Sequence, residues 1–170
     1  MNQEEKLRRE MVETQIKGRG ITSARLIEAL KRVPRHEFVP EGSRGAAYAD
    51  RPIPIGDGQT ISQPYIVALM IDLCDLEGGE TVLEIGTGSG YVAALLSHLA
   101  GMVYTVERFP DLCRSATIRL NSLGFENVQC IEGDGFEGYE PGAPYDAIIL
   151  SAAPPEVRHT VLSPLKDGGR

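Results

Sequence analysis

The sequence lacks the features of several common protein classes. Its apolar runs are far shorter than the roughly 18 to 20 residues of a membrane span, and its N-terminus (MNQEEKLRREM) is charged, unlike a secretory signal. Its three cysteines include no CxxC pair, and its three histidines lie in no spacing typical of metal ligands. We therefore expect a cytoplasmic protein with inert, buried thiols, no membrane contact and no metal site.

Positive charge is also scarce outside the N-terminal quarter. Residues 1–45 hold ten Lys and Arg against seven Asp and Glu, whereas residues 46–170 hold seven against seventeen, and the net charge is −7. Nucleic-acid affinity depends on cations that displace condensed counterions, so this acidic body argues against a nucleic-acid partner. We interpret the basic N-terminal part as solvated helix faces, although it would also suit an anionic substrate.

The chain has 170 residues, 42% of them apolar, which is enough for one domain with a real core. The first part is expected to be helical and rich in loops. Amphipathic patterns predict helices over residues 3–17 and 22–33, the second capped by Thr22 or Ser23 and closed before Pro34. A loop with short extended pieces is predicted over residues 34–58, and a helix over residues 64–75.

After residue 78 the pattern becomes strand, glycine-rich loop and helix, repeated. Strands are predicted at 81–85, 102–107, 127–131 and 145–151, and helices at 90–100, 110–123 and about 155–165. This alternation predicts an α/β fold with a Rossmann-like, doubly wound, mainly parallel sheet covered on both faces. Within a single domain, residues 78–170 would form the Rossmann-like core and residues 1–77 a helical segment on the substrate side.

A glycine-rich loop follows the first predicted strand in VLEIGTGSGY, residues 82–91. Its glycines, Gly86, Gly88 and Gly90, form G-x-G-x-G, and Tyr91 occupies the place of the third glycine in a dinucleotide fingerprint. The loop also has no lysine, unlike a phosphate-binding P-loop. A phosphate ligand is therefore disfavoured, and with it a nucleotide-dependent oxidoreductase.

Two acids after the next strands indicate a nucleoside ligand. Glu107 ends the second strand, 21 residues after Gly86, at the distance where an acid accepts hydrogen bonds from ribose hydroxyls. Asp134, between two glycines after the third strand, is placed to accept from an adenine amino group. Nucleoside recognition by acids without a phosphate site fits S-adenosylmethionine. Structural interpretations also exist: Glu84 as a helix-cap or loop acid, Glu107 as a solvated strand end and Asp134 as an Asx-turn residue.

With these residues the chain resembles the protein-L-isoaspartate O-methyltransferase family over nearly its whole length. The matching stretches are RVPRHEFVP (32–40), YADRPIPIGDGQTISQPYIVALM (48–70), VLEIGTGSGY (82–91), VYTVER (103–108), GDGFEGY (133–139) and APYDAIILSAAP (143–154), of which DGQTISQP (57–64) is particular to this family. The resemblance implies an enzyme that transfers the methyl group of S-adenosylmethionine to the free carboxylate of L-isoaspartyl residues in damaged proteins and peptides. The ester then cyclises to a succinimide, which starts repair. We expect a monomer.

The resemblance also assigns the site. It makes Ser62 the active-site residue, where a structural interpretation is an N-cap for the helix beginning at Pro64. The expected cofactor-binding residues are Gln59, Thr60, Ile61, Glu84, Gly86, Thr87, Gly88, Ser89, Gly90, Glu107, Arg108, Asp134 and Gly135. Phe136 stands where the family often has a small or polar residue, and we expect it to touch no site residue.

Two alternatives follow from where the sequence departs from related patterns. The family continues beyond Gly168-Gly169-Arg170, so the C-terminal strands are expected to be missing, and the chain would then be a truncated, inactive protein that binds S-adenosylmethionine. The other alternative is a methyltransferase with another substrate, such as nucleic acid. An enzyme directed at a base amino group would need [DN]-P-P-[YFW] after the fourth strand, where this chain has Ala-Pro-Pro-Glu at 153–156.

Overall fold

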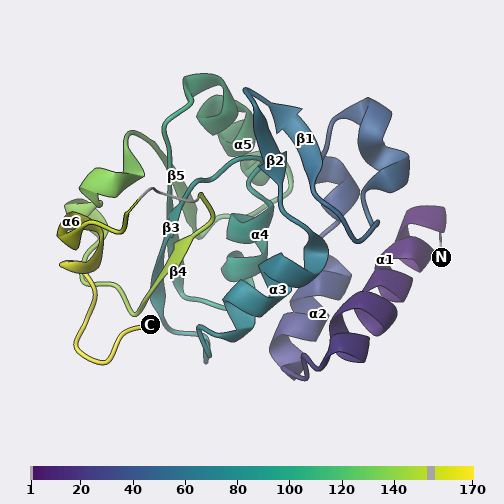
Figure 1. The fold of residues 1–170 in the computed structure, drawn as a ribbon, viewed down its shortest axis with the longest axis horizontal. Coiled ribbons are helices and arrows are strands. Elements are labelled where there is room, and N and C mark those ends of the chain that lie inside the picture. The colour runs from purple at the N-terminus through teal and green to yellow at the C-terminus, as the bar shows by residue number, and fades with distance from the viewer. Residues whose placement is uncertain (1, 153–155) are drawn as a thin grey trace.

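This computed structural model, which describes residues 2–152 and 156–170, is built around a parallel sheet (Figure 1). The sheet has four strands in the order β5-β4-β3-β6. Its strands are β3 (Thr81–Ile85), β4 (Met102–Glu107), β5 (Val128–Glu132) and β6 (Ala147–Leu150). The central strand β3 pairs in parallel register with both neighbours, Leu83 lying opposite Tyr104 and Ile148. The predicted α/β fold and the positions of all four strands are confirmed.

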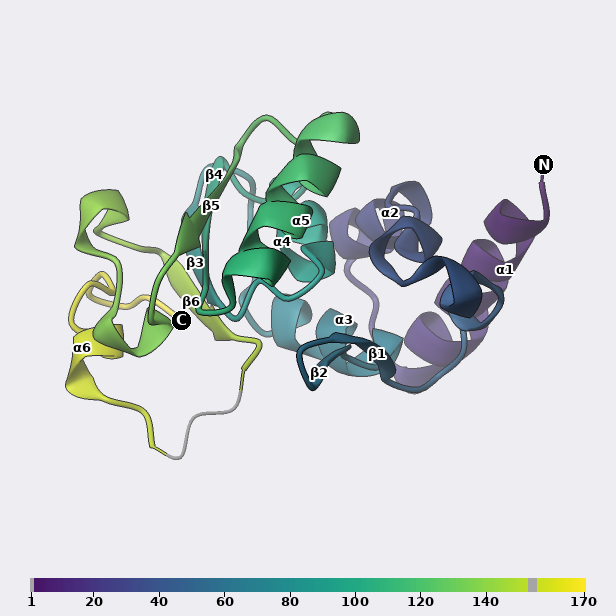
Figure 2. The same ribbon diagram turned by 90° about the horizontal axis from the view of Figure 1, so that it is seen from above.

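Helices cover both faces of this sheet, as predicted. The helices α4 (Tyr91–Ser97) and α5 (Pro110–Ser122) lie on one face, and the short α6 (His159–Leu162) lies on the other (Figure 2). Proline at the first position of α5 sets its start, because its fixed φ suits a helix and its missing N–H would be unpaired there anyway. The last predicted helix is shorter than expected, and its proposed start, Pro155, lies outside the described residues.

The N-terminal helices pack beyond α4. The first predicted helix is α1 (Gln3–Met11), continued by a π-helical turn (Val12–Ile16) and a 3-10 turn (Lys17–Arg19). In α2 (Ala24–Arg32) the hydroxyl of Ser23 accepts a hydrogen bond from the N–H of Leu26, which confirms Ser23 as the cap. The third helix, α3 (Pro64–Asp72), ends three residues earlier than predicted.

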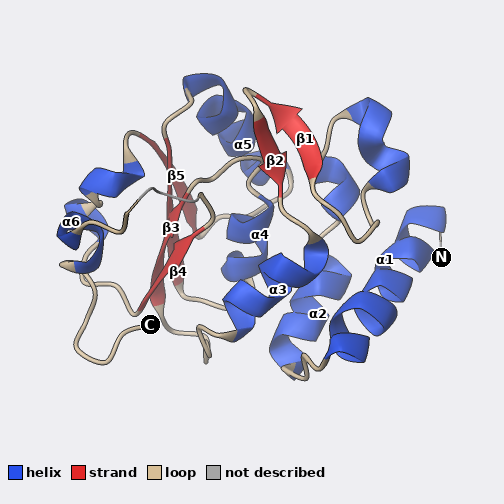
Figure 3. Cartoon of the chain, viewed as in Figure 1, coloured by secondary structure: helices blue, strands red, loops and turns tan. Residues whose placement is uncertain are grey.

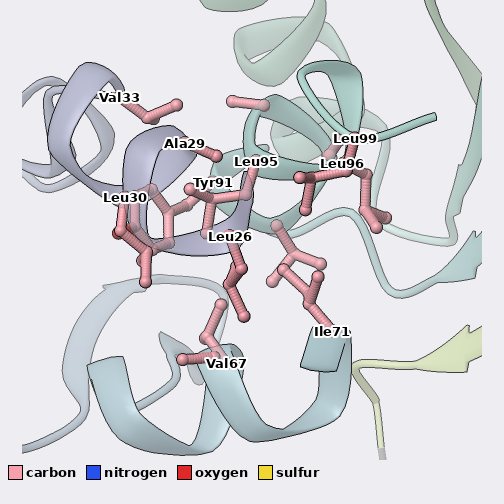
Figure 4. Packing of buried hydrophobic residues seen from close by; sticks show 14 of the residues in the cluster. Leu26, Ala29, Leu30, Val33, Val67, Ile71, Tyr91, Leu95, Leu96 and Leu99 are labelled. Carbon is pink, nitrogen blue, oxygen red and sulfur yellow. The ribbon is translucent and has the colours of Figure 1, made fainter. Parts of the chain in front are cut away.

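One apolar core joins these helices to the sheet. Leu26, Ala29, Leu30 and Val33 of the α2 segment face Val67 and Ile71 of α3 and Tyr91, Leu95, Leu96 and Leu99 of the α4 segment (Figure 4). Leu30 and Leu95 are fully buried. Burying a leucine side chain stabilises a fold by about 1.5 to 3 kcal/mol, so this interface fixes the N-terminal helices against the sheet layer.

A β-hairpin lies in and directly after the segment predicted as loop. Strands β1 (Ile53–Gly56) and β2 (Gln59–Ile61) lie side by side (Figure 3). They pair antiparallel, with Ile53 opposite Ile61. Asp57 and Gly58 form the turn with φ of +50° and +68°, as a two-residue hairpin turn requires. The upstream part of the loop forms 3-10 turns at Arg35–Phe38 and Glu41–Ala46. Short extended pieces were predicted within residues 34–58, and β1 is one of them, but its partner β2 was not predicted.

The cysteines are free thiols. Cys74 and Cys113 are buried, as predicted, and Cys130 is half-buried, where burial raises its pKa to about 11 and keeps it protonated. Within residues 2–152 and 156–170, His, Cys, Asp and Glu form no group of three or more arranged to hold a metal ion. No helix in the described ranges has the length and apolar character needed to cross a membrane.

Candidate active site

The carboxyl ends of the parallel strands open into a cavity of about 340 Å³. In open α/β sheets ligands bind at this edge, where the strand order reverses, and here it reverses at β3, between β4 and β6. The hairpin β1–β2 also borders the cavity. The lining residues are Gly58, Gln59, Thr60, Ser62, Ile85, Gly86, Gly88, Val106, Glu107, Arg108, Phe109, Asp134, Gly135, Phe136, Ser151 and Ala152.

Glu107 holds the glycine loop from the end of β4. Its side chain is only 5% exposed; Oε2 accepts the N–H of Gly88 at 2.8 Å, and Oε1 accepts the N–H of Phe109 at 3.0 Å. Hydrogen bonds to a carboxylate are among the stronger ones in proteins. The interpretation of Glu107 as a solvated strand end is therefore wrong. Each oxygen can accept further bonds, so the carboxylate is able to hold the loop and a ligand hydroxyl together.

Gly86 is required at the start of the loop for two reasons. Its φ is +95°, a conformation that side chains disfavour, and a Cβ there would lie 2.8 Å from the Cβ of Ala152. At the other end of the loop the carbonyl of Ser89 accepts a hydrogen bond from Arg119 at 2.9 Å. The loop is thus fixed at both ends and exposes backbone to the cavity.

Glu84 lies in a different environment from Glu107, although both come from central strands. It is fully buried, and its two oxygens accept hydrogen bonds from the hydroxyls of Thr105 and Ser151, both at 2.8 Å. Burial, followed by the nearby charge of Glu107, raises the pKa of Glu84 to about 8, although the two hydroxyls oppose this. The helix-cap and loop interpretations of Glu84 are wrong, because the residue is an interior member of β3.

Asp134 both forms a turn and lines the cavity. Its Oδ1 accepts the N–H of Phe136 at 3.0 Å, which confirms the Asx-turn interpretation. Gly135 packs on β3 so closely that a Cβ would lie 2.5 Å from Cγ2 of Ile85. Because Phe136 lines the cavity and donates to Asp134, the expectation that it touches no site residue is wrong.

Ser62 follows β2 and precedes α3 at the cavity wall. The N-cap of α3 is Gln63, and no side chain caps this helix, so the interpretation of Ser62 as a cap is wrong. Ser62 borders both the large cavity and an adjoining hollow of about 40 Å³.

The structure brings most of the predicted site residues together. The large cavity is lined by Gln59, Thr60, Ser62, Gly86, Gly88, Glu107, Arg108, Asp134 and Gly135. The adjoining hollow is lined by Ile61, Glu84, Thr87 and Ser89 as well. Gly90 borders neither and instead precedes α4 with φ of +87°, packed on Leu120.

Several lining residues were not predicted. They are Gly58, Ile85, Val106, Phe109, Phe136, Ser151 and Ala152. Most of them end a parallel strand or follow one within a few residues, so the rule that ligands bind at carboxyl strand ends would have indicated them. Residues 153–155, part of the stretch compared with the amino-methyltransferase motif, lie outside the described residues.

A doubly wound parallel sheet with a G-x-G-x-G loop after its first strand and an acid at the end of its second defines the class of Rossmann-like methyltransferases. The family model of protein-L-isoaspartate(D-aspartate) O-methyltransferases matches residues 5–170. This chain belongs to that family.

Similar curated proteins carry the name of this family, and solved structures share its fold. The chain is 51% identical over 163 residues to protein-L-isoaspartate O-methyltransferase of Methanoculleus marisnigri, covering 96% of this chain and 74% of the relative. It is 50% identical over 170 residues to that of Syntrophus aciditrophicus, covering all of this chain and 78% of the relative. A solved protein-L-isoaspartate O-methyltransferase matches with a TM-score of 0.85 and 34% identity, over 95% of this chain and 53% of that one. A Plasmodium falciparum chain solved with S-adenosyl-L-homocysteine shares the fold, with a TM-score of 0.81 and 23% identity over 95% of this chain and 81% of its own.

Proposed function

We propose that this protein transfers the methyl group of S-adenosylmethionine to the free carboxylate of L-isoaspartyl residues in damaged proteins and peptides. The observation that carries the proposal is the single cavity that joins the family-specific segment around Ser62 to the acids Glu107 and Asp134. The membership of the family supports the same reaction.

The cavity residues fit an S-adenosylmethionine molecule. Glu107 offers carboxylate oxygens for ribose hydroxyls, and Asp134 offers Oδ2 for an amino group, since its Oδ1 already serves the turn. Phe109 and Phe136 supply apolar surface suited to a planar base. When bound, this cofactor supplies an electrophilic methyl group on a cationic sulfonium, a charge that suits a cavity in which the two acids outnumber one cation, Arg108.

Ser62 would orient the substrate rather than activate it. A free carboxylate is ionised at neutral pH and is already a nucleophile, so methyl transfer depends on placement and on excluding water. The Ser62 hydroxyl can donate a hydrogen bond to that carboxylate from the cavity wall. Gln59 and Thr60 line the same wall and would bound the junction between substrate and cofactor.

We further propose a cytoplasmic monomer without a nucleic-acid partner. The excess of acidic residues after residue 45 supports the exclusion of nucleic acid. Size-exclusion chromatography with light scattering tests whether the protein is a monomer. A measured mass of twice that of the chain would contradict the monomeric state.

Methyl transfer to a matched peptide pair tests the reaction. One peptide carries L-isoaspartate and the other carries normal aspartate at the same position, and both receive labelled S-adenosylmethionine. Base-labile label on the isoaspartyl peptide alone is the expected result. Label on both peptides would contradict the proposed specificity for L-isoaspartate. Label on neither peptide would contradict the proposed methyl transfer.

The variant Glu107→Ala tests whether Glu107 binds the cofactor. We expect the variant to bind S-adenosylhomocysteine more weakly by about 1.5 to 3 kcal/mol, because it loses bonds to a charged acceptor and loosens the loop at Gly88. Isothermal titration calorimetry measures the affinity. An unchanged dissociation constant would remove Glu107 from the cofactor site.

A further inference from the structure

Arg35 is a fully buried cation directly behind the cavity wall. It begins the 3-10 turn Arg35–Phe38, and its side chain is 0% exposed. Burial lowers its pKa, although two nearby tyrosines oppose this effect. Removing a charged group from water costs several kcal/mol unless partners compensate for the lost hydration. The contacts of Arg35 therefore indicate which role accounts for the burial of its charge.

The guanidinium joins two separate segments of backbone. Its Nε donates to the carbonyl of Ala47 at 2.8 Å, and its Nη2 donates to the carbonyl of Ser62 at 2.7 Å. Ala47 precedes the hairpin β1–β2, and Ser62 directly follows it. Because the planar guanidinium presents its donors in a rigid fork, the two carbonyls are held in a fixed relation on either side of the hairpin.

The same guanidinium also touches the segment that follows the glycine loop. Its central carbon lies 4.7 Å from the ring centroid of Tyr91, the first residue of α4. Tyr91 lies within the core shown in Figure 4 and lines the smaller hollow together with Ser62. Arg35 is thus packed between the substrate-side segment and the start of the helix on the cofactor side.

Carboxylates do not explain this burial. In the part of the chain that the structure describes, none of the ion pairs involves Arg35. Among the same residues its Nη1 and the hydroxyl of Tyr91 have no hydrogen-bond partner. A buried charge satisfied mainly by two backbone carbonyls and an aromatic face is suited to fixing geometry.

We infer that Arg35 is a positioning residue for methyl transfer. By holding the carbonyl of Ser62, it fixes the peptide that carries the Ser62 side chain and sets the hairpin against the glycine loop. This inference rests on the proposed function, in which Ser62 orients the substrate carboxylate. Since Arg35 lines neither the large cavity nor the adjoining hollow, it acts through Ser62 and the neighbouring backbone.

Arg35→Lys tests the inference, with Arg25→Lys as the matched control. Lysine keeps the charge but has no fork to join Ala47 and Ser62. Arg25 likewise donates to two carbonyls, those of Leu76 and Leu99, but borders neither cavity of the site. Both variants lose a bridge between two segments, but only Arg35→Lys loses one at Ser62. Because Arg35 is buried and Arg25 is exposed, the free energy of unfolding of each variant is measured beside kcat, and kcat is compared under conditions where both variants are folded.

We expect Arg35→Lys to lower kcat on the isoaspartyl peptide by on the order of 100-fold, since small misplacements of reacting groups have effects of this size. The dissociation constant of S-adenosylhomocysteine should change by less than about threefold, and Arg25→Lys should leave kcat within about twofold. Amide hydrogen exchange should become faster in residues 59–63 of Arg35→Lys, with exchange in β3–β5 unchanged. If Arg35→Lys does not fold, Arg35→Gln, which buries no charge, has the same expected results.

Two results would overturn the inference. The first is an unchanged kcat with unchanged exchange in residues 59–63. The second is an equal loss of kcat, S-adenosylhomocysteine affinity and global stability, which would describe a purely structural residue. If the wild-type protein methylates neither peptide, the proposed function fails by itself, and the exchange comparison decides whether Arg35 fixes the Ser62 segment.

Discussion

Two glutamates on neighbouring strands show how burial and hydrogen bonding give one residue type two roles. Glu84 lies opposite Thr105 and is enclosed by hydroxyl groups, whereas Glu107, at the end of β4, accepts two backbone N–H groups at the cavity. Burial makes Glu84 neutral at pH 7, because its pKa is raised to about 8. Glu84 is therefore held neutral in the interior, and Glu107 is the acid whose side chain lines the large cavity.

The raised pKa of Glu84 predicts a loss of stability as pH increases. The folded protein keeps the proton that the unfolded chain releases near pH 4.5, so stability is full below that pH and falls as pH rises towards about 8. The slope should approach 1.4 kcal/mol per pH unit within this window. Glu84→Gln, which mimics the neutral acid, should flatten the dependence. Urea unfolding between pH 5 and 8 measures the free energy of unfolding of the wild type and of the variant. If the two free energies changed with pH in parallel, a neutral Glu84 would be contradicted.

Ser62→Ala should separate catalysis from folding. Because Ser62 does not cap α3, its loss should change the free energy of unfolding by less than about 0.5 kcal/mol. The turnover number on the isoaspartyl peptide should fall by about 10- to 150-fold, since a hydrogen bond to a carboxylate contributes about 1.5 to 3 kcal/mol. Affinity for S-adenosylhomocysteine should stay near that of the wild type. A variant with normal turnover would leave Ser62 without a role.

At the scale of elements, the glycine loop is determined by backbone shape. Gly86→Ala should destabilise the protein by about 1 to 3 kcal/mol, because alanine disfavours φ of +95° and its methyl group would press on Ala152. Gly42→Ala is the control, since a Cβ at Gly42 meets no atom within 4 Å. Thermal unfolding compares the two. Equal melting temperatures would show that the loop adapts without cost.

The sequence predicts the elements well where their patterns are regular. The parallel strands and the helices after Gly78 follow from alternating apolar runs and glycine, and Glu107 and Asp134 follow from their places after strands. The strand β2 was missed because Gln59–Ile61 contains a single buried apolar residue and gains its order by pairing with β1. The burial of Glu84 and the bridge made by Arg35 depend on segments distant in sequence, so no local pattern reveals them.

At the scale of the molecule, one core joins the N-terminal helices to the sheet. Leu30→Ala should therefore destabilise both parts together, by about 2 to 5 kcal/mol, the usual cost of a cavity at a fully buried leucine. Urea unfolding followed by circular dichroism should give one transition at a lower midpoint. Hydrogen exchange in β3 should accelerate with it, and retained protection in β3 would show that the two parts unfold separately.

The strand order has a consequence for how the chain is made. On the ribosome β3 emerges before β4, which pairs with one edge of it, and before β5, which pairs with β4. The other partner of β3, β6, begins about sixty residues after β3 ends. At a translation rate of roughly 5 to 20 residues per second, the edge of β3 that pairs with β6 stays unpaired for several seconds during synthesis. An apolar strand with an open edge is a template for pairing with other chains, so nascent chains from which β6 has not yet emerged should bind chaperones more strongly than those from which it has emerged.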